Sequence, residues 1–403
     1  MSTIMLAFAY LRRRWGQALL SVIVGGLGIA AVATAVVGFD ALPDAAERSW
    51  GGADMVVGPK GSALDLVLCC ALHVSDPRGL VSEKAAMAAA HHPLVRIAAP
   101  IALGDNVDGW RIVGTTPGLL SVYRAQIAQG RVWTKPLEAV LGAGVARALH
   151  LKLGAHFIGA HGLESGGESH SQFPYTVTGV LGPTGSVLDR LVLCDIETVR
   201  YIHRKHAEDE AAETGITQTY VNLPDAATAV VASFRSPVAA VLLPRLIDAS
   251  PTLTAASPSF EIARLMSYLR PLTYAATALG ILLVMIAAAG AAAGLMATMN
   301  ARTRDLALLR ALGAGRWSIA SVAFAEALMI AGAALLLGFA LSWGVLAVAT
   351  RLLAERTGLL LMPEVDFASM VYLIFGALVV ALIAALVPAL RATSASIEEL
   401  LQA

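Results

Sequence analysis

Charged residues are scarce in this chain. Only 14% of its 403 residues are charged, 57% are hydrophobic, and the mean hydropathy is +0.69. A soluble protein carries roughly 25% charged residues and 45–50% apolar ones. The shortfall excludes an ordinary water-soluble enzyme, so part of the chain must face lipid.

Charge balance, cysteine content and aromatic content narrow the class of protein further. Basic and acidic residues balance at 29 each, so the chain has no surplus of positive charge for binding nucleic acid. Three cysteines are too few for a disulfide scaffold. Aromatic residues make up 6%, whereas glycine and alanine are abundant. That composition is typical of membrane helices that approach one another closely.

Motifs for ATP hydrolysis and for common hydrolases are missing. A P-loop needs Gly-Lys-[Ser/Thr], because the lysine reaches the β- and γ-phosphates and the hydroxyl holds Mg²⁺. None of the five lysines is followed by serine or threonine. The sequence also has no Gly-x-Ser-x-Gly and no His-Glu-x-x-His. We therefore expect no enzyme activity, and any ATP and Mg²⁺ to be bound by another subunit.

Long apolar runs predict four transmembrane helices. About 20 apolar residues span a hydrocarbon core of about 30 Å, and four runs are long enough, one of them containing a single charge, Glu326. The predicted spans lie near residues 17–39, 272–299, 319–349 and 367–390. A cleaved signal peptide is the rival interpretation of the first run, but that run is longer than the usual 7–15-residue apolar region.

Arginines set the predicted orientation. They precede the first span at Arg12, Arg13 and Arg14, and they recur between the second and third spans and after the fourth. The positive-inside rule places both termini and the 300–317 loop in the cytoplasm. The predicted organisation is therefore residues 1–40 with the first span, an extracytoplasmic domain at 41–270, and three more spans in 271–403.

The extracytoplasmic domain is predicted to be mixed α/β. Asp195 is in the position of an N-cap for one predicted helix. Short β-branched runs predict strands at Asp54–Val57, Val95–Ile101, Arg111–Val113, Ala139–Leu141, Tyr175–Val180, Leu191–Cys194, Thr217–Asn222 and Val238–Leu243. Helical spacing predicts helices at Ser82–His91, Gly144–Leu149, Ile196–Glu213 and Ala226–Arg235.

The layout of one span, a large domain and three spans resembles the MacB/FtsX-type permeases of ABC transporters, the type VII or mechanotransmission class. The segment from Arg302 to Ala314, with Leu-Arg-Ala-Leu-Gly-Ala at its end, is similar to a cytoplasmic motif of that family, although Asp305 replaces the usual Glu. The tail from Pro388 to Leu401 and the runs at Ala139–Phe157 and Tyr175–Leu181 are similar as well.

The resemblance implies a permease subunit in the bacterial inner membrane, with its domain in the periplasm. A separate cytoplasmic ATPase would drive it, unlike MacB itself, which fuses its ATPase to the permease. The family moves lipids, lipoproteins, peptides or drugs, or drives a periplasmic adaptor or lipoprotein. A dimeric ATPase and one coupling segment per chain imply a homodimer, for which Gly25, Gly26 and Gly28 offer a close-packing face.

The cytoplasmic loop carries the candidate coupling residues. Leu306, Leu309 and Leu312 share one helical face, and Gly313 is in the position of a C-cap. One interpretation is an amphipathic helix on the membrane surface. The other, which the resemblance favours, is a coupling helix that docks on the ATPase. The candidate residues are Arg302, Arg304, Asp305, Leu306, Leu309, Arg310, Leu312 and Gly313.

Glu326 is the one acidic residue within a predicted span. Inserting an unpaired acidic side chain at the centre of a membrane helix costs about 2.5–3.5 kcal/mol. It is either a proton or ion group or a structural residue that faces a partner helix. The resemblance favours the structural role, because family members with an acidic residue here do not conduct ions.

The nine histidines all fall in the 41–270 domain. Imidazole and carboxylate groups together suit Zn²⁺, which gives an alternative function as a zinc-handling subunit. The alternative for the residues themselves is a solvated surface. The candidate ligands are His161, Glu164, Glu168, His170, His203 and His206.

Two further expectations concern the domain and its connection to the membrane. Cys194 either pairs with Cys69 or Cys70, or all three are small buried hydrophobic residues. The second span, about 28 apolar residues or roughly 42 Å, exceeds the bilayer and should project outward as a stalk. Pro271 and the Gly51-Gly52 pair are the expected hinges.

Overall fold

The computed structural model describes residues 3–162, 169–214, 225–300, 315–356 and 367–394. The chain divides into two compact units. The membrane unit comprises Met1–Leu42, Tyr268–Leu352 and Leu361–Ala403, and the outer domain comprises Pro43–Ser267 with Leu353–Leu360.

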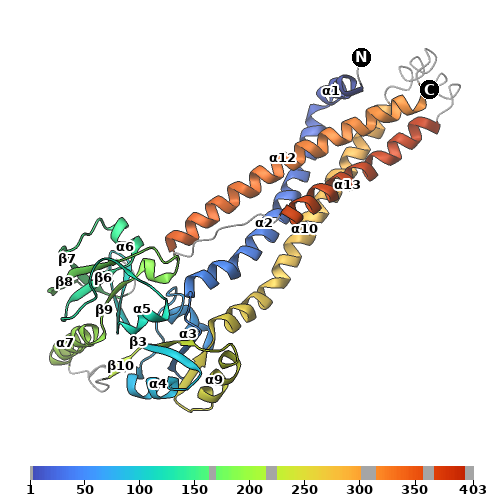
Figure 1. The fold of residues 1–403 in the computed structure, drawn as a ribbon. Coiled ribbons are helices and arrows are strands. Elements are labelled where there is room, and N and C mark those ends of the chain that lie inside the picture. Colours follow the sequence, from blue (N-terminus) through green and yellow to red (C-terminus); the bar gives the residue numbers. More distant parts are fainter. Residues whose placement is uncertain (1–2, 163–168, 215–224, 301–314, 357–366, 395–403) are drawn as a thin grey trace. The chain divides into compact units, whose positions relative to one another are not determined.

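In the described ranges, the membrane unit is built from one short helix and four long apolar helices (Figure 1). They are α1 Thr3–Arg13, α2 Trp15–Trp50, α10 Pro258–Asn300, α12 Arg316–Arg356 and α13 Phe367–Ser394. Three helices in the described ranges are long and apolar enough to cross a membrane, and α13 contains a shorter apolar stretch, Met370–Leu386.

Small residues let α2 pack closely on α10 and α12. A Cβ atom on Gly28 would lie 2.7 Å from the carbonyl oxygen of Gly280. Gly26 likewise contacts Leu337 on α12, and Thr34 donates a hydrogen bond to Ser342 at 3.1 Å. The close-packing face predicted on the first span therefore contacts helices of the same chain, rather than being left for a second copy.

The outer domain contains a ten-stranded sheet with the order β12-β1-β11-β3-β4-β9-β6-β8-β5, and β7 pairs with both β3 and β8. A small second sheet joins β10 and β2. The strands are β1 Met55–Pro59, β2 Val81–Ser82, β3 Val95–Val107, β4 Trp110–Thr115, β5 Ile127–Gly130, β6 Glu138–Leu141, β7 His156–His161, β8 Ser169–Leu181, β9 Val192–Asp195, β10 Ala226–Ala227, β11 Ala229–Phe234 and β12 Leu253–Ala256.

Each face of the large sheet has its own hydrophobic core. The α3-side core contains Leu66, Leu119 and Leu193, and the α7-side core contains Ile112 and Val199. Helices α3 Ala63–Cys70, α5 Gly118–Val122 and the 3₁₀ helix η1 Val187–Arg190 cover the first, while α4 Glu83–Ala90, α6 Ala143–Ala148, α7 Ile196–Thr214 and α9 Ala239–Asp248 cover the second.

Helix starts follow the capping residues of the sequence. The Ser62 hydroxyl accepts from the Asp65 N–H at the start of α3, and the Ser82 hydroxyl accepts from the Ala85 N–H at the start of α4. At α7 the Asp195 carboxylate accepts from the Glu197 N–H at 2.8 Å, as predicted. These side chains satisfy backbone donors that the first helical turn leaves unpaired.

Two predicted elements are wrong. Residues Ala226–Arg235, predicted as a helix, form β10 and β11, because β11 lies between β1 and β3 and is apolar on both faces, which hides the strand period. Residues Val238–Leu243, predicted as a strand, lie largely in α9, whose buried residues Ala239, Leu243 and Ile247 recur every four residues. The predicted strand Thr217–Asn222 lies outside the described residues.

The three thiols are free and buried. Cys69 and Cys70 belong to the α3-side core, whereas Cys194 belongs to the α7-side core. Because the sheet separates the two cores, the disulfide between Cys194 and either neighbour is excluded, and the interpretation as buried small hydrophobic residues is correct.

The two expected hinges lie at different kinds of position, and their role as hinges stays a prediction. Pro271 lies inside α10, which runs from Pro258 to Asn300. Gly51 and Gly52 form a turn directly after α2 ends at Trp50. Gly52 has φ +123°, a conformation that L side chains rarely adopt.

Candidate functional site

The predicted coupling segment is not part of the described structure. Arg302, Arg304, Asp305, Leu306, Leu309, Arg310, Leu312 and Gly313 all lie between the end of α10 at Asn300 and the start of α12 at Arg316, outside the described residues. Their role as an ATPase contact stays a prediction from the sequence.

Glu326 is buried in the membrane unit. Its exposed fraction is 6%, and it lines a cavity together with Arg14, Gln17 and Gly294. The Arg14 guanidinium donates to the Gly294 carbonyl oxygen at 3.1 Å. The carboxylate therefore lies within the helix bundle, near polar groups from α2 and from Arg14, which precedes that helix.

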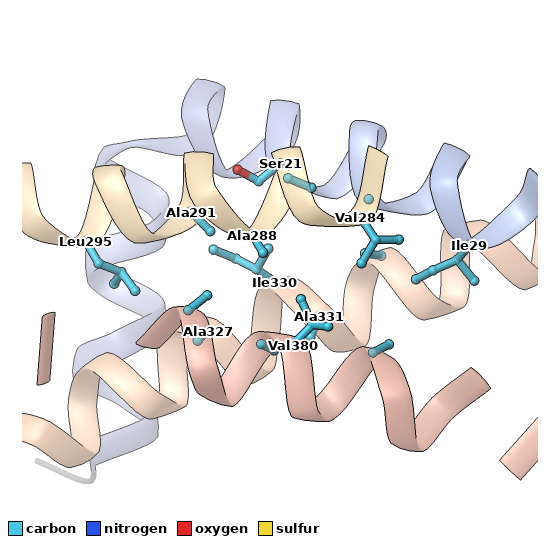
Figure 2. Close-up of a pocket in the computed structure, with 16 residues that line it drawn as sticks. Ser21, Ile29, Val284, Ala288, Ala291, Leu295, Ala327, Ile330, Ala331 and Val380 are labelled. Carbon is cyan, nitrogen blue, oxygen red and sulfur yellow. The ribbon is translucent and has the colours of Figure 1, made fainter. Parts of the chain in front are cut away.

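A second cavity occupies the interior of the membrane unit between α2, α10, α12 and α13 (Figure 2). Most of its lining residues are alanines, and Ser21 is the one with a polar side chain. Ile29, Val284 and Ile330 supply its larger side chains. The space is apolar and offers no charged or hydrogen-bonding path.

In the outer domain the structure brings together two of the predicted metal ligands. His161 ends strand β7, and His203 lies on α7. Their rings meet edge to face with centroids 5.2 Å apart. Glu164 and Glu168 lie outside the described residues; His170 is on β8 and His206 on α7, but neither side chain is described.

A third residue lies beside the two histidines: Asp105, which was not among the ligands predicted from the sequence. Asp105 on β3 is fully buried, and its Oδ1 lies 2.8 Å from His203 Nε2 and 3.7 Å from His161 Nδ1. His203 is 4% exposed, whereas the side chain of His161 is 48% exposed. One donor atom from each residue lies within 4.8 Å of the others, so the trio is the right size for a metal ion.

A β-bulge places Asp105 on this face of the sheet. The register between β3 and β4 shifts between Leu103, which pairs with Val113, and Asp105, which pairs with Ile112. Leu103 and Val113 belong to the α3-side core, whereas Ile112 belongs to the α7-side core. The extra residue, Gly104, thus redirects Asp105 toward α7.

Two neighbours of Asp105 fit the local geometry. A Cβ atom on Gly104 would collide with the His203 ring, so only glycine lets that ring approach β3. The Asn106 amide donates to the carbonyl oxygens of Ala160 and Gly162 at 3.3 and 3.1 Å, which holds the end of β7 beside β3. A glycine followed by Asp-Asn inside an apolar run was the sequence signal for this bulge.

Helix α7 is held in place by Arg200, one turn before His203. Its guanidinium donates to Glu197 at 2.6 Å, to Glu83 at 2.5 Å and to the Ala226 carbonyl oxygen at 2.7 Å. Arg200 is 5% exposed. These charge-assisted hydrogen bonds fix the rotation of α7, and so the direction of His203.

A buried histidine, His73, lies on the α3 side of the sheet. His73 follows α3 with φ 53°. Burial, and then the nearby charges of Arg111 and Arg190, lower its pKa from 6.5 to about 3. His73 is therefore neutral at physiological pH.

Two families match the sequence. Residues 18–236 match the family described as MacB-like periplasmic core domain. Residues 277–397 match the family described as FtsX-like permease C-terminal. No curated protein matches the chain.

Two solved structures are similar to the outer part of the chain. The periplasmic region of MacB from Actinobacillus actinomycetemcomitans is 14% identical, covering 54% of this chain and 94% of that one with a TM-score of 0.34. The extracellular domain of the noncanonic ABC-type transporter YknZ from Gram-positive bacteria is 12% identical, covering 50% and 99% with a TM-score of 0.30.

Because both identities and both TM-scores are low, the solved structures do not contribute to the family assignment. That assignment rests on the two family matches. The first match alone covers more than half of the 403 residues, and the second covers most of the remaining membrane helices. The chain belongs to the MacB/FtsX-type permeases of ABC transporters.

Proposed function

We propose that this ABC permease subunit works by mechanotransmission. A separate cytoplasmic ATPase, which binds and hydrolyses MgATP, moves the membrane helices, and these move the outer domain in the periplasm. The observation that carries the proposal is the apolar cavity between α2, α10, α12 and α13. It is lined by apolar residues apart from Ser21, so this cavity offers no charged lining to a polar solute. The polar groups of Arg14, Gln17 and Glu326 line the other described cavity of the membrane unit.

The ends of two helices support the same mechanism. Helices α2 and α10 each contribute residues to both units. Ala46 and Trp50 on α2, and Ile262 on α10, are at most 9% exposed and belong to the α3-side core of the outer domain. Movement of either helix would therefore act directly on that core.

The remaining parts of the proposal follow from sequence and family. Four crossings, with both termini and the 300–317 loop in the cytoplasm, fit the distribution of arginines. We propose two copies per dimeric ATPase, and a lipid, lipoprotein, peptide or drug as cargo, or a periplasmic adaptor or lipoprotein as the driven partner. Glu326 has a structural role. The family matches do not favour a zinc-handling subunit as the function.

A double substitution in the coupling segment tests the proposal. Leu309→Asp with Leu312→Asp should abolish co-purification with the ATPase and its stimulation, because two charges would have to enter an apolar groove without partners. The measurement is ATPase activity of the reconstituted complex in nanodiscs, together with the yield of the permease from membranes.

A matched control adds the same charge elsewhere. On a helical projection, Ala307 and Ala311 lie opposite Leu309 and Leu312. Ala307→Asp with Ala311→Asp should therefore keep most of the stimulation. Equal stimulation by the leucine double variant and the parent would show that this segment does not couple to the ATPase.

A further inference from the structure

We infer that Asp105, His161 and His203 form an exchangeable Zn²⁺ site on the outer domain. This inference is independent of the proposed function, because it rests on contacts within the outer domain and not on the coupling segment. The three residues come from three separate elements, β3, β7 and α7. They meet only in the folded domain.

The distances between donor atoms suit a zinc ion. Zinc binds imidazole nitrogen and carboxylate oxygen at about 2.0–2.2 Å in a tetrahedron, so neighbouring ligand atoms lie about 3.3 Å apart. Asp105 Oδ1 lies 2.8 Å from His203 Nε2 and 3.7 Å from His161 Nδ1, which brackets that value. The donor atoms of the two histidines lie within 4.8 Å of each other, so a metal ion would have to draw these two side chains together by at most about 1.5 Å.

The chemical type of the donor atoms indicates which metals would bind. Two imidazoles with one carboxylate favour Zn²⁺ and its transition-metal neighbours, whereas Mg²⁺ and Ca²⁺ prefer oxygen ligands alone. Metal-bound imidazole also needs a deprotonated nitrogen, which neutral histidine supplies. A divalent cation would, in addition, offset the charge of the fully buried Asp105 carboxylate.

Two of the three proposed ligands are buried, and the third is accessible to solvent. Asp105 and His203 are at most 4% exposed, so their positions are fixed by the bulge at Gly104 and by α7. The side chain of His161 is 48% exposed, so an ion can reach the site from solvent. Three protein ligands with one position open to water are typical of zinc sites whose ion reacts or exchanges, whereas structural sites have four.

The bulge and the glycine argue for a built site rather than a chance meeting of side chains. Without the register shift at Gly104, Asp105 would lie on the α3-side face, away from both histidines. With any larger residue at position 104, the His203 ring would have to move. Two separate local features are thus needed to form the trio.

The test uses the full-length chain with an affinity tag other than histidine, in nanodiscs, after treatment with EDTA. Titration with Zn²⁺ should show a tight site at one ion per chain. Titration with Co²⁺ should give visible absorption bands of a tetrahedral or five-coordinate site, which Zn²⁺ then removes. Mg²⁺ at the same concentration should give no binding.

Variants locate the ion. His161→Ala, at the exposed position, should weaken zinc binding by more than the about 10–100-fold that loss of an outer-shell partner costs, with an unchanged circular dichroism spectrum. Asp105→Asn should have a similar effect, and Gly104→Ala a smaller one. His156→Ala is the matched control, because His156 is also exposed on β7 but contacts Thr176 instead.

Three results would overturn the inference: no tight zinc site in the parent, a tight site that survives His161→Ala, or a site lost equally in His156→Ala. The first would leave the trio as a hydrogen-bonded Asp–His contact. The others would place the ion on different histidines. If Asp105→Asn fails to fold, His161→Ala decides the question alone.

Discussion

The outer domain and the membrane unit are packed in opposite ways. The domain fills two cores with large side chains such as Tyr175, Met55 and Leu193, all fully buried. The membrane unit joins its helices through glycines and leaves an apolar cavity lined mostly by alanines, while large residues such as Leu282 and Phe375 are more than half exposed.

The difference reflects the two solvents. In water, burial of apolar area drives packing, so large side chains turn inward. In lipid that drive between helices is lost, and close backbone contact through small residues takes its place. The two units therefore differ in what holds them together: large buried side chains in the outer domain, and close contacts of small residues in the membrane unit.

The largest expected effect comes from removing a large side chain of the domain core. Tyr175 is fully buried and stacks on Phe157 with ring centroids 5.1 Å apart. Tyr175→Ala should lower the free energy of unfolding by about 3–5 kcal/mol. Leu282→Ala, at a residue 55% exposed on α10, should change it little. Limited proteolysis of the domain against denaturant measures both, and equal losses would contradict the comparison.

The next effect tests the glycine contact within the membrane unit. Gly28→Ala should destabilise the bundle by about 1–3 kcal/mol through overpacking, because its Cβ would lie 2.7 Å from the Gly280 oxygen. Gly332→Ala is the matched control on α12: no atom lies within 4 Å of the added carbon, so helix propensity should stabilise it by up to about 1 kcal/mol.

Thermal unfolding in detergent measures this pair of variants. Opposite signs are the expected result. A destabilised Gly332→Ala, or a stabilised Gly28→Ala, would show that close backbone contact is not what joins α2 to α10.

The third effect appears only at acidic pH and concerns a residue of the outer domain. Because the pKa of His73 falls from 6.5 to about 3 on folding, the unfolded chain binds a proton between these values that the folded domain does not. Stability from this residue is complete above pH 6.5 and decreases as the pH falls toward 3. At pH 5 the loss is about 2 kcal/mol.

Asparagine is the suitable replacement, because it tolerates the positive φ of 53° at this position. His73→Asn should flatten the fall in domain stability between pH 7 and pH 5, whatever its stability at neutral pH. A parental slope retained in the variant would assign the pH dependence to other groups.

The sequence predicted the parts of the fold that depend on local pattern. Apolar length predicted α2, α10 and α12, β-branched runs predicted β3 and β6, and helical spacing predicted α4. Errors arose where tertiary context overrides the pattern. The central strand β11 is apolar on both faces, and α9 carries β-branched residues at helical spacing.

The candidate site could be predicted only in part for the same reason. Histidine is a common metal ligand, so the sequence alone suggested His161 and His203 as candidate ligands. Asp105 is brought to them by a register shift of one residue and a contact across 98 positions of sequence. A single sequence carries no long-range pairing of that kind, and a glycine within a strand is only a hint of the bulge.

The placement of the three thiols has a practical consequence. Burial raises the pKa of Cys194, and a hydrogen bond with Cys69 followed by burial raises that of Cys70, so little reactive thiolate forms in the folded domain. Alkylation then requires local opening. Because Cys70 and Cys194 lie on opposite faces of the sheet, the native chain carries two built-in reporters, and their separate labelling rates show which face opens first.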